Sequence, residues 1–373
     1  MTIVNEGHSV GLEKEFYVVD GSNQTYQQYT IDTIVKERMQ NEMKAYDSDV
    51  GPKCYVDASG PFEITTRPCT DLQQLSDDIT TTYRFAKEES EKQGLYALGM
   101  GGRPGAPDDA AGLHVHVGYA NEGEADYVFH ELQKHVPDII ALSANSPSRD
   151  GMVKCLRQYG NPIKHLFDFL GAGDTLFYGH TFSPFEKTGR SSVIYKRDDS
   201  NTVEVRCMDT QGTPEEDTAV AAYIFGIAEK AKEDFNNGVE QVGIGKEEKR
   251  NFKRAVRKGM EATFRVDGKK VPVSQVVAAT LKEIQPYLEQ YDCPDEVIDV
   301  LNERVATKRC GADDIMDIYR EEGVGGFWGS LTRPFLLSSK RERLIKHLGY
   351  RDRFEEEQER QDDDPSSMVA SPT

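Results

Sequence analysis

Four short segments of the chain alternate apolar residues with residues that bind metal ions or phosphate. The segments read GLEKEF, PFEITT, GLHVHVG and TVEVRC. Their polar positions carry carboxylate, imidazole or guanidinium groups, at Glu13, Glu15, Glu63, His114, His116, Glu204 and Arg206. Carboxylates and imidazoles bind divalent cations, whereas a guanidinium binds phosphate through two parallel hydrogen bonds.

The alternation has the two-residue period of a β-strand, which places every second side chain on the same face of a sheet. In GLHVHVG, for example, the histidines alternate with Leu113, Val115 and Val117. If the four strands are neighbours, their polar faces form one surface, and we call the surface that carries these seven residues the floor. For any single segment, a half-buried sheet with a solvated polar face is the simpler alternative.

The composition of the floor indicates which ion it would bind. Carboxylate oxygens with one or two imidazoles suit Mg²⁺ or Mn²⁺ better than Zn²⁺. Four carboxylates are more than one Mg²⁺ usually takes, so two or three ions bridged by a nucleoside triphosphate would balance the charge. A zinc hydrolase is the alternative, but the other histidines fall in expected loops or helices without the H-E-x-x-H spacing.

Capping and hydrophobic spacing predict the elements that position these segments. Residues 9–20 alternate as a strand in which Lys14 is an exception on the apolar side. A helix is expected from about 71 to 91, opened by the capping-box spacing of Thr70 and Gln73. A second covers roughly 124–142 and must kink or divide at Pro137. Helices are also expected from Thr213-Pro214 to Asn236-Asn237-Gly238 and at 246–262, 273–290, 294–306 and 311–321.

The order of these elements indicates the fold class and the domain organisation. Strands separated by helices, followed by a helical C-terminal part, indicate an α+β fold. No repeat or long Gly/Ser linker interrupts the chain, so we expect one catalytic domain over residues 1–353. Residues 354–373, FEEEQERQDDDPSSMVASPT, lack the apolar residues of a core, and we expect them to form a disordered acidic tail.

Composition excludes several classes of partner. The chain carries 45 Lys and Arg against 64 Asp and Glu, a net charge of −19, which argues against nucleic acid and anionic membranes. Its six cysteines are scattered without a C-x-x-C pair, unlike a disulfide framework. No signal-peptide pattern or apolar run of about 20 residues is present. We therefore expect a cytoplasmic protein with small-molecule partners, and the sequence does not decide between a monomer and a homo-oligomer.

The common nucleotide-binding fingerprints are missing. GIGKEEK at 243–249 does not match the P-loop, and GMGGRPG at 99–105 does not match G-x-G-x-x-G. The second segment places Arg103 where it could touch an anionic ligand, and the alternative is a tight loop leading into the histidine strand. No G-x-S-x-G nucleophile motif occurs either.

The floor segments resemble those of a known family, the ATP-dependent carboxylate-amine ligases that include the bacterial and archaeal type of glutamate-cysteine ligase. GLEKEFYVVD, FEITTRPCTDL, GLHVHVG and VEVRCMDTQ resemble the family's acidic, histidine and E-x-R strands. ALSANSPSRDG at 141–151 and NFKRAVRKGMEA at 251–262 are similar to two further family motifs. The matches follow the family's order over residues 9–262.

The resemblance implies a glutamine-synthetase-like fold, in which a curved antiparallel sheet backed by helices carries nucleotide and metals on its open face. It implies that Glu13, His114 and Glu204 hold one metal, that Glu15 and Glu63 hold a second, and that Arg206 contacts the transferred phosphate. His116 would position phosphate or substrate. Nucleotide contacts are expected from Arg103, Asn145, Arg254 and Arg257. Alternatively, Asn145 caps a helix end, and Arg254 and Arg257 belong to the exposed face of a charged helix.

The reaction that the resemblance implies is phosphorylation of a carboxylate by ATP, with Mg²⁺ or Mn²⁺, to an acyl phosphate that an amine then attacks. The prototype would activate the γ-carboxylate of glutamate and use cysteine as the amine. Ser148-Arg149-Asp150 stands where the family usually has bulky aromatic residues, which leaves another amine as an alternative acceptor. A nucleotide- or amino-acid-binding protein without catalytic activity is a further alternative.

Overall fold

The computed structural model of the protein describes residues 7–19, 28–43, 46, 51–56, 61–102, 111–148, 151–155, 158, 192–196, 201–243, 245–317 and 319–320. All structural statements below concern these residues. The predictions for Arg103 and for the acidic tail at 354–373 lie outside them.

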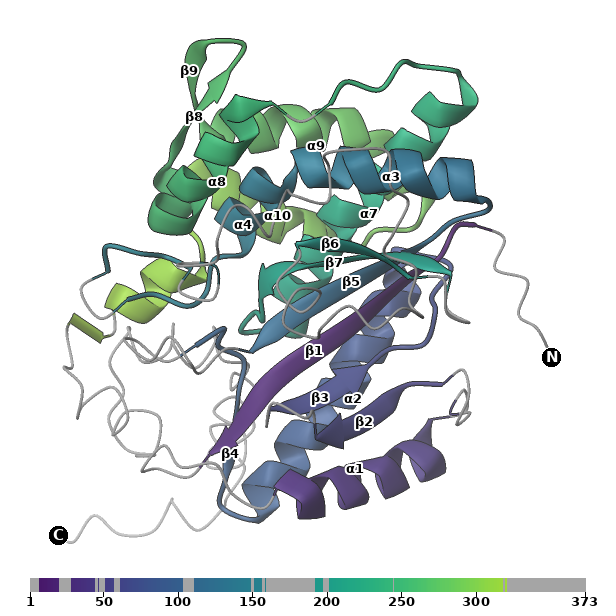
Figure 1. Ribbon diagram of the computed structural model, residues 1–373. Coiled ribbons are helices and arrows are strands. Elements are labelled where there is room, and N and C mark those ends of the chain that lie inside the picture. Colours follow the sequence, from purple (N-terminus) through teal and green to yellow (C-terminus); the bar gives the residue numbers. More distant parts are fainter. Residues whose placement is uncertain are drawn as a thin grey trace, which may run out of the picture.

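A curved antiparallel sheet forms the centre of the described molecule (Figure 1). Its strands run in the order β2-β3-β1-β5-β7-β6, and β4 also pairs with β1. Every pairing is antiparallel. The strands are β1 (Val10–Val19), β2 (Lys53–Val56), β3 (Phe62–Thr65), β4 (Tyr96–Leu98), β5 (Gly112–Gly118), β6 (Val193–Lys196) and β7 (Thr202–Asp209).

Helices pack on the apolar side of this sheet and complete an α+β fold (Figure 1). Leu12, Phe16, Val115 and Val205 point from the strands into the core that the helices cover. The helices are α1 (Gln28–Glu42), α2 (Leu72–Lys92), α3 (Glu122–Lys134), α4 (Val136–Ser143), α7 (Pro214–Asn236), α8 (Lys246–Lys258), α9 (Val273–Gln290) and α10 (Asp295–Thr307). Residues 311–317 are also helical. None of the helices in the described part of the chain is long and apolar enough to cross a bilayer.

Helix ends agree with the predicted signals in most places. α7 begins with a complete capping box between Thr213 and Glu216 and ends at Asn236. The helix predicted across 124–142 is divided at His135, two residues before Pro137, so that α3 and α4 are separate. The predicted cap of α2 is wrong by one residue: Asp71, rather than Thr70, accepts the hydrogen bond from the Gln74 N–H at 2.7 Å.

The C-terminal part contains a β-hairpin that the sequence patterns did not predict. α8 ends at Lys258 instead of continuing to 262, because Gly259 adopts a positive φ of 51° and a short 3-10 turn follows. A two-stranded hairpin comes next, formed by β8 (Thr263–Val266) and β9 (Lys269–Pro272). Gly268 supplies a positive φ at its turn.

Lys14 is buried beneath the floor, on the apolar side of β1. Its ammonium group lies 2.5 Å from Asp217 Oδ2 and 2.7 Å from the carbonyl oxygen of Gln211, and the ring of Tyr83 covers it. Both charged side chains are fully buried. The exception in the strand alternation is therefore a buried ion pair that joins β1 to α7.

Candidate metal and nucleotide site

Strand register places six of the seven floor residues on one face of the sheet. Glu13 of β1 lies opposite His114 of β5, and Glu15 lies opposite Glu63 of β3. His116 lies opposite Glu204 of β7. Residues that face each other across antiparallel strands point to the same side. The structure therefore brings these side chains together, and their apolar neighbours face the helices.

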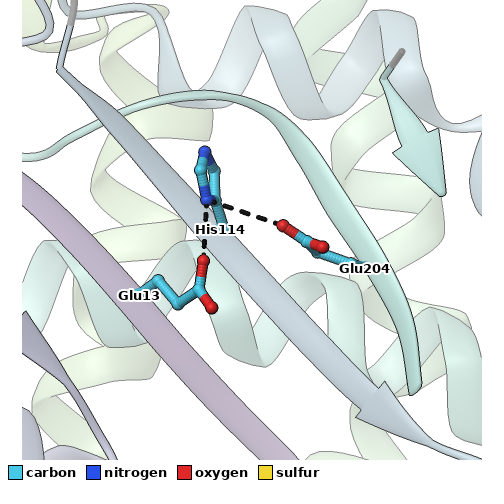
Figure 2. Close-up of side chains that lie close together, drawn as sticks. All are labelled: Glu13, His114 and Glu204. Atoms are coloured by element: carbon cyan, nitrogen blue, oxygen red, sulfur yellow. Dashed lines mark hydrogen bonds and ion pairs between the residues drawn. The ribbon is translucent and has the colours of Figure 1, made fainter. Parts of the chain in front are cut away.

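Three floor residues form a compact set of possible metal ligands (Figure 2). Nδ1 of His114 lies 3.0 Å from Glu13 Oε2 and 3.6 Å from Glu204 Oε1. One ligand atom from each of Glu13, His114 and Glu204 lies within 4.8 Å of the others. His114 and Glu204 are buried, and Glu13 is half-buried. These donors come from three adjacent strands, so the sheet itself fixes their spacing.

His116 lies beside the same group. Its Nε2 is 3.1 Å from Glu13 Oε1 and 3.9 Å from Glu204 Oε1. Its other nitrogen, Nδ1, is 3.1 Å from the hydroxyl of Thr202. Both histidines therefore contact Glu13, but His116 is also held by Thr202 at the end of the floor.

Glu15 and Glu63 form a second acidic pair one step along the floor. Glu15 accepts a 2.6 Å hydrogen bond from the Gly112 N–H, and its Oε1 lies 3.9 Å from His114 Nε2. Glu63 accepts a hydrogen bond from the hydroxyl of Tyr55, its partner on β2. The floor thus extends over β3, β1, β5 and β7, and β2 supports it through Tyr55.

Arg206 follows Glu204 by two residues on β7, so the alternation of the strand points both side chains to the floor. The register between β5 and β7 shifts between Leu113 and Val115, and the Arg206 N–H bonds to the carbonyl oxygen of Ser192 at 2.8 Å. Its guanidinium forms an ion pair with Glu204. The bond between Arg206 and Ser192 continues the regular pairing of β6 with β7, in which Val193 lies opposite Val205.

Burial and neighbouring charges set the protonation states of Glu13 and His114 to those that bind a cation. Burial raises the pKa of Glu13, but hydrogen bonds from His114 and His116 outweigh it and hold the pKa well below its usual range. Burial, assisted by the charge of Arg206, lowers the pKa of His114 despite its bond to Glu13. An ionised carboxylate beside a neutral imidazole is the donor form that metals require.

Arg206 remains charged in this setting. Burial lowers its pKa, but the carboxylates of Glu204 and Glu13 raise it by more, so the net pKa lies above the ordinary value. A permanent positive charge thus stands beside the acidic donors.

The residues expected to contact nucleotide lie in different settings. The buried amide of Asn145 donates to the carbonyl oxygens of Gly99 at 3.1 Å and Thr210 at 2.7 Å. Arg254 donates to Asn251, and Arg257 is exposed on α8. Within the described residues, neither arginine bonds to a floor residue.

Asp209, at the end of β7, is a site residue that the sequence patterns missed. Its Oδ2 accepts hydrogen bonds from the Asn145 N–H and from the Ser146 hydroxyl, both at 2.7 Å. A Cβ atom at Gly101 would lie 2.4 Å from the Asp209 Cβ, so glycine is required there. Asp209 therefore fastens the segment after α4 to the end of β7 and packs closely against Gly101. The signal that could have identified Asp209 is its position two residues after the alternating segment TVEVRC.

Comparisons with known proteins identify the family of this chain. The model of "Glutamate-cysteine ligase family 2 (GCS2)" matches residues 105–159 and 184–332. A glutamate-cysteine ligase of Natronomonas pharaonis is 23% identical over 369 residues, covering 87% of this chain and 95% of that protein.

Solved structures share the fold. The ligase PafA, in complex with the prokaryotic ubiquitin-like protein Pup, matches 97% of this chain and 72% of its own with a TM-score of 0.51 and 14% identity. A bifunctional glutathione synthetase from Pasteurella multocida matches 94% of this chain and 52% of its own, also with a TM-score of 0.51 and 13% identity.

Fold, site and comparisons together define the class: the protein is an ATP-dependent carbon–nitrogen ligase with a glutamine-synthetase-like fold. The family match covers more than half of the chain, and the chain belongs to glutamate-cysteine ligase family 2. The family resemblance noted in the sequence is thereby confirmed, and the match includes the floor segments of β5 and β7. Membership implies ATP and a divalent cation.

Proposed function

We propose that this ligase uses ATP to phosphorylate the γ-carboxylate of glutamate, and that the amine of cysteine attacks the acyl phosphate to give γ-glutamylcysteine. The observation that carries the proposal is the set of three donors, Glu13, His114 and Glu204, on adjacent strands within 4.8 Å. The family match and the name of the Natronomonas pharaonis relative support the choice of substrates.

The donor chemistry fits Mg²⁺ or Mn²⁺. Two carboxylates and one neutral imidazole form an oxygen-rich set, which suits these ions better than zinc. Glu13, His114 and Glu204 would hold one ion, and Glu15 with Glu63 would hold another. When bound, such ions neutralise charge on the phosphates and orient them.

The protein's own groups supply positioning and charge. Arg206 stands beside Glu204 with a fixed positive charge and would contact the transferred phosphoryl group. His116, held by Thr202, would orient phosphate or the carboxylate substrate. Arg103, Asn145 and Arg254 remain our candidates for nucleotide contacts, whereas Arg257 is exposed on the outer face of α8. We place the whole activity in one domain, residues 1–353, because β1 through α10 share one core.

Mass spectrometry of the products tests this function. The protein is incubated with ATP, Mg²⁺, glutamate and a panel of amines that includes cysteine. We expect ADP, phosphate and a product with the mass of γ-glutamylcysteine. A product with a different amine would replace cysteine as the acceptor, and no ADP release with any carboxylate and amine would contradict the proposal.

A matched pair of variants assigns the activity to the floor. Glu204→Gln keeps the size of a buried floor residue but removes its charge. Glu303→Gln makes the same change on an exposed face of α10. We expect the first to lower kcat at least about a hundredfold, as loss of a charge-stabilising group does, and the second to retain full activity.

A further inference from the structure

A basic surface stands out on this acidic protein. Residues 246–270 contain ten Lys and Arg against four Asp and Glu, although the whole chain has a net charge of −19. The segment comprises α8 and the β8–β9 hairpin, which lie together at one end of the molecule (Figure 1). We define the basic surface by six exposed cations of this segment, Lys246, Arg250, Lys253, Arg257, Lys269 and Lys270; Lys258, Glu261 and Asp267 of the same segment are exposed as well.

Helical geometry aligns four of these cations. Lys246, Arg250, Lys253 and Arg257 recur at spacings of four, three and four residues, which is one face of a helix. The opposite face buries Phe252, Ala255 and Val256 against the core. Like charges at these spacings repel one another by a few tenths of a kcal/mol per pair in isolated helices. The outer face of α8 is therefore a continuous positive stripe.

The hairpin extends the stripe. Arg265 of β8 lies directly opposite Lys270 of β9, and like charges in that position are unfavourable. Asn251 of α8 bonds to both the N–H and the carbonyl oxygen of Arg265, at 2.9 and 2.7 Å. Helix and hairpin are thus fastened together, so their charges form one surface.

The cations of this surface are uncompensated. Among the described residues, no carboxylate forms an ion pair with any of the six side chains that define the basic surface. Elsewhere in the described chain, by contrast, basic side chains such as Arg38 and Arg309 each contact two or more carboxylates. A surface that repels itself in this way is suited to a polyanionic partner.

We propose that the partner is the chain's own acidic segment, residues 355–364, which docks on the basic surface. The segment EEEQERQDDD carries seven carboxylates and one arginine, so its surplus of six negative charges equals the surplus of positive charge over 246–270. The match to the ligase family ends at residue 332, so the segment lies beyond the part of the chain that resembles the family.

The connection is long enough. Arg320 lies beside Gly151, and the nearby Lys154 N–H bonds to Val256 of α8, so the described chain ends close to that helix. The 35 residues from Arg320 to Glu355 can span up to about 115 Å, against roughly 20 Å for the length of α8. Tethering raises the local concentration of the segment to the millimolar range. A free nucleic acid lacks that advantage and is repelled by the net charge of the protein.

Zero-length carbodiimide cross-linking of the full-length protein tests the proposal. A mixture of unlabelled and nitrogen-15-labelled chains separates links within one chain from links between copies. At low ionic strength we expect links from Lys246, Lys253, Lys269 or Lys270 to carboxylates at 355–364 of the same chain. In about 1 M NaCl, where the Debye length is about 3 Å, these links should fall about tenfold.

Two charge-reversal variants complete the test. Arg250→Glu/Lys253→Glu should reduce the links from the remaining lysines of the basic surface about tenfold. Lys282→Glu/Lys308→Glu makes the same change in net charge at exposed positions elsewhere and should leave them unchanged. Three outcomes would each overturn the proposal. The links could be spread evenly over the surface lysines, or they could form only between labelled and unlabelled chains. In the third outcome, the segment forms no links, and a DNA duplex binds in a way that needs Arg250 and Lys253.

Discussion

At the scale of single residues, the two histidines of β5 share Glu13 but differ in their other contacts. His114 is buried between Glu13 and Glu204, with both carboxylates approaching the same nitrogen. His116 is more exposed and also contacts the hydroxyl of Thr202. His114 is therefore the better candidate for a metal ligand, and His116 for a group that positions phosphate or substrate.

This difference predicts an order of effects. We expect His114→Ala to weaken Mn²⁺ binding at least about tenfold, because a ligand is lost, and by more than His116→Ala does. Titration calorimetry of both variants with Mn²⁺, in the absence of nucleotide, measures the two affinities. If His116→Ala had the larger effect on Mn²⁺ affinity, the two roles would have to be exchanged.

The sequence predicted most of the floor at this scale. Alternation along a strand is a local property, so spacing alone assigned the polar residues of each segment to one face of its own strand. The pairing of β3, β1, β5 and β7 joins these faces into one floor. The residues that support these floor side chains from other elements could not be predicted from spacing. Lys14 and Asp217 are separated by 203 positions, and Asp209 accepts a hydrogen bond from Asn145, 64 positions away. Such pairs depend on the tertiary arrangement of elements, which no local pattern encodes.

At the scale of elements, the ion pair between Lys14 and Asp217 joins the floor strand β1 to the central helix α7. Both side chains have zero exposure. Burial raises the pKa of Asp217 to about 6 even though Lys14 lowers it. A buried carboxylate that loses its cation is strongly destabilising, typically by 3–5 kcal/mol.

We therefore expect Lys14→Met to lower the free energy of unfolding at pH 8 by about 3–5 kcal/mol. The double variant Lys14→Met/Asp217→Asn should recover more than half of that loss, because no charge remains buried and Asn can still accept the Gln211 N–H. Urea unfolding of the wild type and both variants measures these values.

The loss in Lys14→Met should also depend on pH. Below its raised pKa, folded Asp217 binds a proton that the unfolded chain does not, so this group favours folding increasingly as pH falls from 8 towards 5. Without Lys14 the pKa of Asp217 rises further, because the cation that lowers it is gone. The variant therefore gains more stability from this protonation than the wild type does, and its destabilisation at pH 5 should be smaller than at pH 8. If Lys14→Met lowered the free energy of unfolding equally at both pH values, the unpaired charge of Asp217 would not be the cause of the destabilisation.

Sequence patterns predicted the longer elements better than the short ones. α2, α7, α9 and α10 carry caps or clear apolar spacing, and they were placed within a few residues. α1 was missed because it buries only a narrow row of side chains, Ile31, Val35 and Met39, among polar residues. β2, β4 and the β8–β9 hairpin have three or four residues each, too few for a period to be recognised.

At the scale of the whole molecule, the floor gathers strands from far apart in the chain. β1 and β7 are separated by nearly two hundred residues but flank β5 on either side. A ligand that contacts all three strands therefore binds only the folded state and must stabilise it.

We expect Mg²⁺ with ADP to raise the melting temperature of the protein. At a ligand concentration of about a hundred times Kd the gain is about 2.7 kcal/mol, which corresponds to a few degrees for a chain of this size. Differential scanning fluorimetry measures the shift. Glu204→Gln should lose most of it, whereas Glu303→Gln should show the full shift, and an undiminished shift in Glu204→Gln would remove Glu204 from the metal site.

The Lys14–Asp217 pair also determines which face of β1 becomes the floor. A strand shifted by one residue would turn every side chain to the opposite face. Such a shift would bury Glu13 or Glu15 beside Asp217 and leave Lys14 among the donors of the floor. The pair therefore disfavours this incorrect strand pairing during folding, so a residue that never meets the substrate selects the sheet that can bind it.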